Sequence, residues 1–343
     1  MIKMADQLDF ESFAPKTLVV GVGGQGSNLV NRLNSNGLQS AHTVALNTDL
    51  AHLNIIRAHK KILIGKELTR GLGAGGFPEV AAKCADSSRR EIEEAIAGYD
   101  LVFIAAGMGG GTGTGASPVV AELAKAQGST VIAAVTYPFA LERSRKFKAD
   151  AGIKELSKHA DSVMVIENDK LLGYCPNLPM EKALEVVDNV TGSAVKNIAD
   201  AITLPSLINL DYADLRAIVM NTGTALISIG TGSGPDRVEK AIASTKAHPL
   251  LTADIDDARG ALVHVIGGTD LTISDATRIG EGVTEGMGNS ANVIFGARMM
   301  PELHDQVRVM SVITGVKAKF GERRVAEEVH ASTLRLEALG AMY

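Results

Sequence analysis

The most informative chemistry in this 343-residue chain lies in a glycine-rich segment at residues 106–116, AGMGGGTGTGA. It follows an apolar stretch typical of a buried strand and precedes a helical stretch. The segment offers mainly backbone N–H groups, with the hydroxyls of Thr112 and Thr114 between them, and such a nest suits a polyphosphate. A structural turn does not need so many glycines, because each loses conformational entropy on ordering. The segment therefore favours phosphate binding.

A second glycine segment, GVGGQGSN at residues 21–28, fits the pattern GxGxxG through Gly21, Gly23 and Gly26. Glycines there would let the backbone approach a phosphate at a helix start. A tight strand-to-helix turn without a ligand explains the same residues equally well. A dinucleotide site also expects an acidic residue ~20 positions further on, and Asp49 stands later than that, so this test decides nothing.

The third segment, GKELTRGLGAGGFP at residues 65–78, is either a surface loop or another phosphate-facing turn. Ala74, Gly75 and Gly76 have the composition of such a turn, and Pro78 suits the first position of a helix. The Walker A pattern GxxxxGK[ST] does not occur in the chain. Three glycine segments at one sheet edge fit a nucleoside triphosphate better than a dinucleotide.

A pair of acids, Asp211 and Asp214, stands in the segment NLDYAD at residues 209–214. Their spacing at an expected helix start puts both carboxylates near one face. An acid at the N-cap followed by another in the first turn is also ordinary helix capping. The residues alone favour capping over catalysis.

The first half of the chain alternates short β-rich runs with helical stretches, such as 79–98 and 116–127. Several runs are almost wholly apolar, as expected of parallel strands covered on both faces. This order predicts an α/β fold with a doubly wound parallel sheet, whose strand ends carry the glycine segments. The expected strands begin at Leu18, His42, Lys61, Leu101, Thr130 and Ser162.

The second half begins with one long helix expected at residues 180–201, followed by a smaller α/β domain with a mixed or antiparallel sheet. Two helical segments, starting at Pro235 and Ser274, separate its strands. The expected strands are TALISIGTG, ALVHVIGG, SANVIFGARMM and VRVMSVITG.

Composition excludes several classes of protein. The net charge of −5 argues against a protein that coats nucleic acid. No apolar run reaches the ~20 residues that span a bilayer, and the N-terminus is too acidic and polar for a signal peptide. Two cysteines indicate neither a disulfide framework nor a zinc cluster. We expect a soluble cytoplasmic protein.

The sequence GGGTGTG after a strand is the signature of the tubulin and FtsZ superfamily. The chain resembles FtsZ, the bacterial and archaeal cell-division GTPases, along nearly its whole length, whereas tubulins are longer and diverge elsewhere. The resemblance rests, in order, on GVGGQGSN, NTD, GKELTRGLGAGG, TYPFALE, ENDKLL, INLDYAD, GALVHVIGG and VIFGA. It implies GTP or GDP as the nucleotide, Mg²⁺ as the metal, and head-to-tail filaments of the protein itself.

By this resemblance, the first two glycine segments hold the phosphates and the third lies near the terminal phosphate. The residues expected to contact the nucleotide are Gly23, Gly24, Gln25, Asn28, Asn47, Ala74, Gly75, Gly76, Gly107, Gly109, Gly110, Gly111, Thr112, Gly113, Thr114 and Gly115. No protein ligand to the metal is assigned.

The ribose and base contacts are carried over in the same way. Glu142 matches the ribose-contacting acid, although a charge at a helix start would be equally ordinary, and Arg145 or Lys146 supplies the cation that follows it. Asn168 is expected at the sugar or base. On the long helix Asn189 is expected to face guanine, while Leu184 replaces the family's phenylalanine.

The resemblance also reverses the interpretation of the acid pair. In the family this loop enters the nucleotide site of the neighbouring subunit and polarises the attacking water, so Asp211, Asp214 and Asn209 are the expected catalytic residues. Phosphoryl transfer mainly needs positioning and charge stabilisation. Hydrolysis would then depend on assembly.

The implied organisation is a GTP-binding domain (1–179), a central helix (180–203), a C-terminal GTPase-activating domain with the synergy loop (204–316) and a tail (317–343). The expected function is the scaffold of the division ring at mid-cell, with membrane-anchoring division proteins as partners. The tail shows no clear recruiting motif. Direct membrane insertion and nucleic-acid binding are not expected.

Two other functions remain open on the sequence. Departures from the family at Leu184, Ser206 and Phe77 would suit a tubulin-like cytoskeletal paralogue that binds GTP and shapes cells with weak GTPase activity. An NAD-dependent Rossmann enzyme would use Gly21, Gly23 and Gly26, but it leaves GGGTGTG and the acid pair unexplained.

Overall fold

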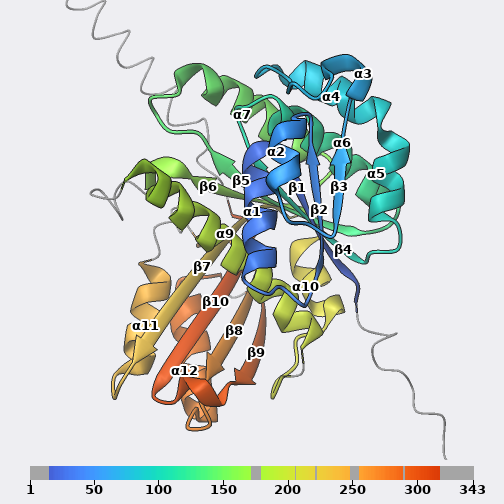
Figure 1. Cartoon of the computed structure of the whole chain (residues 1–343). Helices are drawn as coiled ribbons and strands as arrows, with labels where there is room; N and C mark the ends of the chain where they lie inside the picture. Colours follow the sequence, from blue (N-terminus) through green and yellow to red (C-terminus); the bar gives the residue numbers. More distant parts are fainter. Residues whose placement is uncertain are drawn as a thin grey trace, which may run out of the picture.

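The computed structural model describes residues 15–170, 179–204, 206–220, 222–247, 255–288 and 290–316 (Figure 1). The tail expected at 317–343 lies outside these residues, as do Cys175 and Pro205.

Six parallel strands form the N-terminal part of the sheet, as predicted. In spatial order they are β3 (Lys60–Leu63), β2 (His42–Asn47), β1 (Thr17–Val22), β4 (Leu101–Gly107), β5 (Thr130–Tyr137) and β6 (Ser162–Glu167). β1 is buried at every position. Its apolar residues therefore face helices on both sides, which explains the near-continuous apolar runs.

Helices cover both faces of these strands, so the sheet is doubly wound. Leu18, Val20 and Val22 face one core, and Val19 faces the other. The first core packs against α4 (Pro78–Ser87), α5 (Arg89–Ile96), α6 (Thr112–Ala126) and α7 (Arg143–Leu156). The second packs against α1 (Gly23–Ser35), α2 (Leu50–Ile55), α9 (Met180–Thr203) and α10 (Tyr212–Val219).

The single helix predicted over 79–98 is wrong, because the chain breaks at Ser88 into α4 and α5. Ser88 leaves the helical conformation at φ −112° and ψ 17°. Its hydroxyl accepts a hydrogen bond from the backbone N–H of Gly65 at 3.2 Å, just before the short helix α3 (Lys66–Thr69). A long-range contact thus stabilises a break that the local pattern does not reveal.

The predicted mixed sheet of the C-terminal domain is confirmed. β10 (Gln306–Thr314) runs antiparallel to β7 (Gly223–Ser233) and β8 (Gly260–Gly267), and β9 (Asn292–Met299) pairs with β8 in parallel. The helices α11 (Arg237–Lys246) and α12 (Ile273–Thr284) pack on this part, and the 3-10 turn η2 (Pro301–Leu303) precedes β10.

The two halves share one sheet, which the sequence did not predict. β6 and β7 pair in parallel over Ser162–Gly223, Val163–Thr224 and Met164–Ala225, and the described strands form a single ten-stranded sheet. The long helix α9 is about 36 Å from end to end and contacts α1 and β7. It thereby connects the N-terminal half to the C-terminal domain (Figure 1).

Candidate functional site

The three glycine segments come together at the carboxyl ends of β1 and β4. A side-chain carbon placed on Gly23 would lie 2.8 Å from the backbone nitrogen of Gly113. One placed on Gly111 would lie 3.0 Å from Cβ of Ala74 and 3.2 Å from the nitrogen of Gly76. Glycine is therefore needed at these contacts, because larger residues would force the segments apart.

Much of what the sequence suggested to be loop is the first turn of a helix. α1 begins at Gly23 and α6 at Thr112, so the TGTG half of the signature is helical. Gly113 packs against the carbonyl oxygen of Gly107, and Gly115 against that of Pro78, which lets α6 start close to β4 and α4. The first N–H groups of a helix have no intrahelical acceptor, and they attract anions.

Hydrogen bonds hold the glycine segments in place. The N–H of Gly109 donates to the Thr114 hydroxyl at 2.8 Å, and the hydroxyls of Thr48 and Thr112 are 2.7 Å apart. Nζ of Lys148, on α7, donates to the carbonyl oxygen of Gly76 at 2.7 Å. The turn at 74–76 is therefore tied to a helix outside the glycine segments.

Two further hydrogen-bond networks position polar side chains beside the glycine segments. Oε1 of Gln25 accepts from the Thr136 hydroxyl at the end of β5, at 2.8 Å. The ring of His52 lies 3.2 Å from Nδ2 of Asn47 and 3.0 Å from Oδ1 of Asn28. In the three glycine segments, an added side-chain carbon would meet nothing within 4 Å at four positions, Gly24, Gly73, Gly76 and Gly110.

A polar cavity of about 540 Å³ lies between α1 and α9, lined by Asn28, Arg32, Glu185 and Asp188 among others. Arg32 pairs with Glu185 at 2.9 Å and with Asp188 at 3.5 Å. Burial raises the pKa of Asp188 to about 6, even though the Arg32 guanidinium acts in the opposite direction. Asn189, which the resemblance placed at guanine, is exposed.

The end of β6 contributes one more buried polar group. Asn168 is 6% exposed, and its Oδ1 is buried without a hydrogen-bond partner among the described residues. Such an atom is costly unless a ligand or water satisfies it. The side chain of Leu184 lies outside the described residues.

The segment expected at the ribose lies beside the glycine segment at 106–116. Glu142 accepts from the N–H of Phe139 at 3.1 Å and pairs with Arg145 at 2.5 Å. A side-chain carbon on Gly109 would lie 2.7 Å from the carbonyl oxygen of Arg145. Of the two candidate cations, the Arg145 side chain is 59% exposed, whereas that of Lys146 is 9% exposed and lies 3.6 Å from Asp169.

The acid pair starts α10 in a reciprocal capping box. Asp211 accepts from the N–H of Asp214 at 2.7 Å, and Asp214 accepts from the N–H of Asp211 at 3.3 Å. Oδ1 of Asn209 accepts from the N–H of Ser206 at 2.8 Å, which closes the preceding turn. Capping is thus present, and it leaves an oxygen of each carboxylate for other partners.

The acids and the glycine segments lie at opposite ends of the strands of the sheet. The hydroxyl of Tyr212, next to Asp211, contacts Asp100 and Thr130, which stand at the amino ends of β4 and β5. The glycine segments follow the carboxyl ends, roughly 20 Å away along a strand of this length. Figure 1 shows α10 at the other end of the strands from α2 and α3. One chain therefore does not bring the two groups together.

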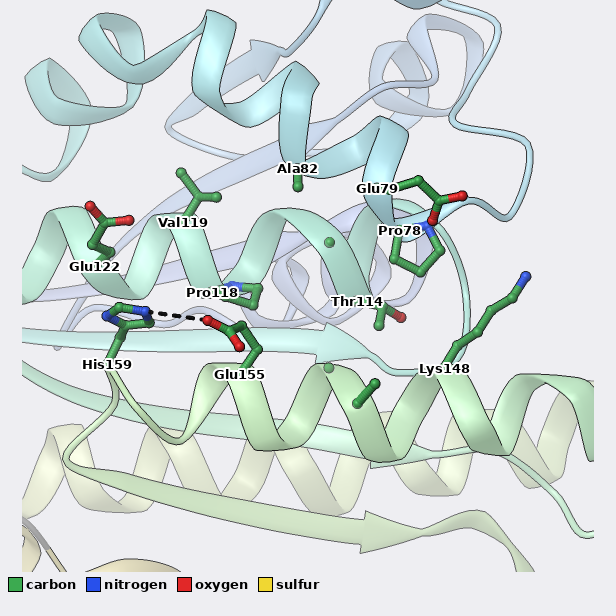
Figure 2. Close-up of a pocket in the computed structure, with 13 residues that line it drawn as sticks. Pro78, Glu79, Ala82, Thr114, Pro118, Val119, Glu122, Lys148, Glu155 and His159 are labelled. Atoms are coloured by element: carbon green, nitrogen blue, oxygen red, sulfur yellow. Dashed lines mark ion pairs between the residues drawn. The ribbon is translucent and has the colours of Figure 1, made fainter.

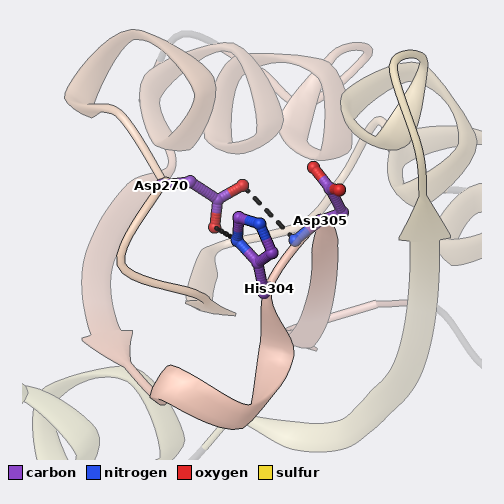
Figure 3. Close-up of side chains that lie close together, drawn as sticks. All are labelled: Asp270, His304 and Asp305. Atoms are coloured by element: carbon purple, nitrogen blue, oxygen red, sulfur yellow. Dashed lines mark hydrogen bonds and ion pairs between the residues drawn. The ribbon is translucent and has the colours of Figure 1, made fainter.

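Two other features are a cavity and a cluster of side chains. A cavity of about 490 Å³ between α4, α6 and α7 adjoins the glycine segments, since Thr114, Gly115 and Lys148 line it together with Ala82 and Val119 (Figure 2). In the C-terminal domain Asp270, His304 and Asp305 lie together (Figure 3). Arg237 already pairs with Asp270, so this cluster is explained by an ion pair between α11 and the end of β8.

Sequence reasoning missed several of these groups. Lys148, Thr48 and Thr136 act through contacts between segments distant in the sequence, which no local motif reveals. Asp188 stands beside Asn189, and only its burial against α1 distinguishes the two. Among the described helices, none has the length and hydropathy needed to cross a bilayer.

Comparisons with known proteins agree with this geometry. A model of the Tubulin/FtsZ family GTPase domain matches residues 16–176, and a model of the FtsZ family C-terminal domain matches residues 223–317. The cell division protein FtsZ 2 of Methanocaldococcus jannaschii is 50% identical over 306 residues, which cover 88% of this chain and 80% of that protein.

Solved structures give the same result for the fold. An FtsZ dimer from M. jannaschii superposes with a TM-score of 0.84 at 43% identity, covering 91% of this chain and 93% of that one. CetZ2 from Haloferax volcanii, solved as a GTPγS-bound protofilament, shares the fold with a TM-score of 0.78 at 24% identity, covering 93% and 99% of the two chains. The chain therefore belongs to the FtsZ family, and it is a GTPase of that family.

Proposed function

We propose that this GTPase polymerises head-to-tail and that each active site is completed by the acids of the next subunit. The observation that carries the proposal is the placement of the glycine segments and of Asp211 and Asp214 at opposite ends of the strands of one sheet. Stacking one subunit on another along the strand direction brings the acids of one subunit to the glycine segments of the next. Such a contact is heterologous and repeats along an open filament.

The proposed nucleotide site extends from the helix ends to the cavity between α1 and α9. The first turns of α1 and α6, with the turn at 74–76, hold the phosphates through backbone N–H groups. The segment of Glu142 lies at the ribose, and the cavity beside Asp188 receives the base. The orphaned oxygen of Asn168 supports this fit, because it can accept from an N–H or O–H group of the ligand.

Hydrolysis in this arrangement needs no covalent intermediate. Asp211 and Asp214 of one subunit orient a water molecule toward the terminal phosphate of the next subunit's GTP, while the helix ends stabilise the charge on the phosphates. Asn209 stabilises the turn that presents them. Mg²⁺ bound with the triphosphate would neutralise part of its charge.

The test of this proposal is GTP turnover per subunit, measured over a range of protein concentrations with Mg²⁺ present. We expect a low rate that rises steeply above a threshold, because an isolated subunit lacks the acids at its nucleotide. Light scattering on the same samples should show polymer above the same threshold. A rate per subunit that is constant down to the most dilute sample would mean that one chain holds a complete site.

We further propose that the carboxylate of Asp188 binds the guanine base, since a carboxylate can accept hydrogen bonds from both N–H groups on one edge of that base. Its pKa of about 6 then makes GTP affinity depend on pH. The ionised form binds, so affinity should fall by roughly tenfold per pH unit below that pKa. Without nucleotide, the stability of the fold should instead increase as the pH falls, because a carboxyl whose pKa is raised on folding binds its proton more tightly in the folded state.

Calorimetric titration with GDP between about pH 5 and pH 8 checks this dependence. Asp188→Asn should lose it, along with much of the preference for guanine over adenine nucleotides. If Asn189→Ala loses the base preference while Asp188→Asn keeps it, the base contact belongs to Asn189, as the resemblance first implied.

The cellular role proposed is the scaffold of the division ring at mid-cell, recruited by membrane-anchoring division proteins. Similarity to a named cell division protein at 50% identity supports this role. The alternative of a cell-shape paralogue is not favoured, because the relative that is 50% identical over 88% of this chain is named as a cell division protein. Fluorescent fusions in a dividing host cell would test it, with a ring expected at the constriction.

A further inference from the structure

The segment that carries the acids is held to the body of the protein at two points. On one side, the backbone N–H and C=O of Ile208 bond to the C=O and N–H of Ala297 on β9, at 3.0 and 3.1 Å. On the other, the Tyr212 side chain reaches the N-terminal half of the sheet. Asp211 lies between these points.

The Tyr212 hydroxyl joins two strands of the GTPase domain. It donates to the carbonyl oxygen of Asp100 at 2.8 Å and lies 2.8 Å from Oγ1 of Thr130, which is 3% exposed. The same carbonyl also accepts from the backbone N–H of Thr130 at 2.8 Å, so the hydroxyl binds to a rigid strand end. Tyr212 is the first residue of α10, directly after Asp211.

We propose that Tyr212 is a positioning residue for hydrolysis, whose hydroxyl sets the place of Asp211 and Asp214 relative to the GTPase domain. This inference rests on the function proposed above. The capping box fixes the two acids relative to α10, but nothing in that box fixes α10 relative to the strands. Leu215, Ile218 and Val219 pack the body of α10 on the second core. The hydroxyl adds a directional restraint on its first turn, where the acids lie, and a displacement of about 1 Å in a reacting group can cost ~100-fold in rate.

Removing the hydroxyl alone separates positioning from folding. In Tyr212→Phe the ring still packs on the core it now contacts, and the capping box stays intact. The Asp100 carbonyl keeps its bond from the Thr130 N–H. We expect GTP affinity, the threshold for assembly and the melting temperature to stay close to wild type, while turnover per polymerised subunit falls roughly tenfold.

Matched variants sharpen this test. Tyr99→Phe removes a hydroxyl from the residue that precedes Asp100; this hydroxyl bonds the His42 ring at 2.9 Å, and its loss should leave turnover unchanged. Thr130→Val should reduce turnover in the same direction as Tyr212→Phe, and Thr130→Ser, which keeps a hydroxyl, should restore it. Wild-type turnover in Tyr212→Phe, or a loss that follows the melting temperature, would overturn the proposal.

Mixing experiments locate the effect in one of the two subunits. A chain with Gly111→Val should donate acids but leave its own site empty at GTP concentrations well below its weakened affinity. A chain with Asp214→Ala should bind nucleotide but not donate a complete acid pair. Their mixture should hydrolyse GTP and sediment as polymer. Tyr212→Phe should lower the activity of the mixture when it is added to the Gly111→Val chain, which donates the acids, and not when it is added to the Asp214→Ala chain.

The outcomes separate the two proposals. A mixture that sediments as polymer but has no activity counts against the shared site itself. An active mixture in which Tyr212→Phe acts equally in both chains leaves the shared site standing and rejects the positioning role of Tyr212.

Discussion

Asp214→Ala should bind GTP with near wild-type affinity and assemble, yet lose roughly 100-fold or more in turnover, the range for a lost acid–base group. Its carboxylate lies at the amino ends of the strands, away from the chain's own glycine segments. The same loss is expected for Asp211→Ala. Equilibrium binding of GTP and single-turnover hydrolysis in polymer measure the two properties separately.

Helix capping must be separated from catalysis, because the two acids also cap α10. Asp211→Asn provides the separation, since asparagine is as good an N-cap as aspartate but carries no charge. We expect it to keep stability and lose turnover. Thr272→Ala removes a capping box of the same kind from α12 and should cost stability without affecting turnover. If turnover is kept in Asp211→Asn but lost in Thr272→Ala, it depends on helix capping, and a catalytic role of the acids is contradicted.

Gly111→Val should reduce GTP affinity by roughly 100-fold or more, because two glycine segments would have to separate around the new side chain. Its Cβ would lie 3.0 Å from Cβ of Ala74 and 3.1 Å from the nitrogen of Phe77. The backbone at this point must also approach a phosphate closely. Fluorescent GDP displacement measures the affinity.

The control for Gly111→Val is a comparable clash far from the glycine segments. Gly280→Val on α12 places a side chain 3.2 Å from the Phe295 ring and should lower the melting temperature while leaving GTP affinity unchanged. Normal GTP affinity in Gly111→Val would remove this segment from the proposed site.

The fold was largely predictable because its strands are continuous apolar runs bounded by glycine turns. The features that the sequence did not predict depend on contacts between residues distant in the chain. The break at Ser88 follows from its bond to Gly65, and the single sheet follows from a short joint between 162–164 and 223–225. Neither feature has a local pattern in the sequence.

The site was predictable in its residue types but not in its arrangement. Glycines reveal where the backbone must come close, so the sequence identified segments that the structure brings together, and their contact with phosphate stays a prediction. The position of the acids at the opposite end of the strands required the strand order and the contacts of Tyr212. The distinction between Asp188 and Asn189 required knowing which of them turns toward α1.

The proposed sharing of sites between subunits would also set a stoichiometry. In an open filament each contact between neighbours would complete one site, so a filament would have one complete site fewer than it has subunits. A dimer would then split only one of the two nucleotides that it binds, and the unsplit molecule would mark one end of the filament. Only closure into a ring would remove that remainder. The fraction of bound GTP that survives a single turnover would therefore measure the mean length of the filaments.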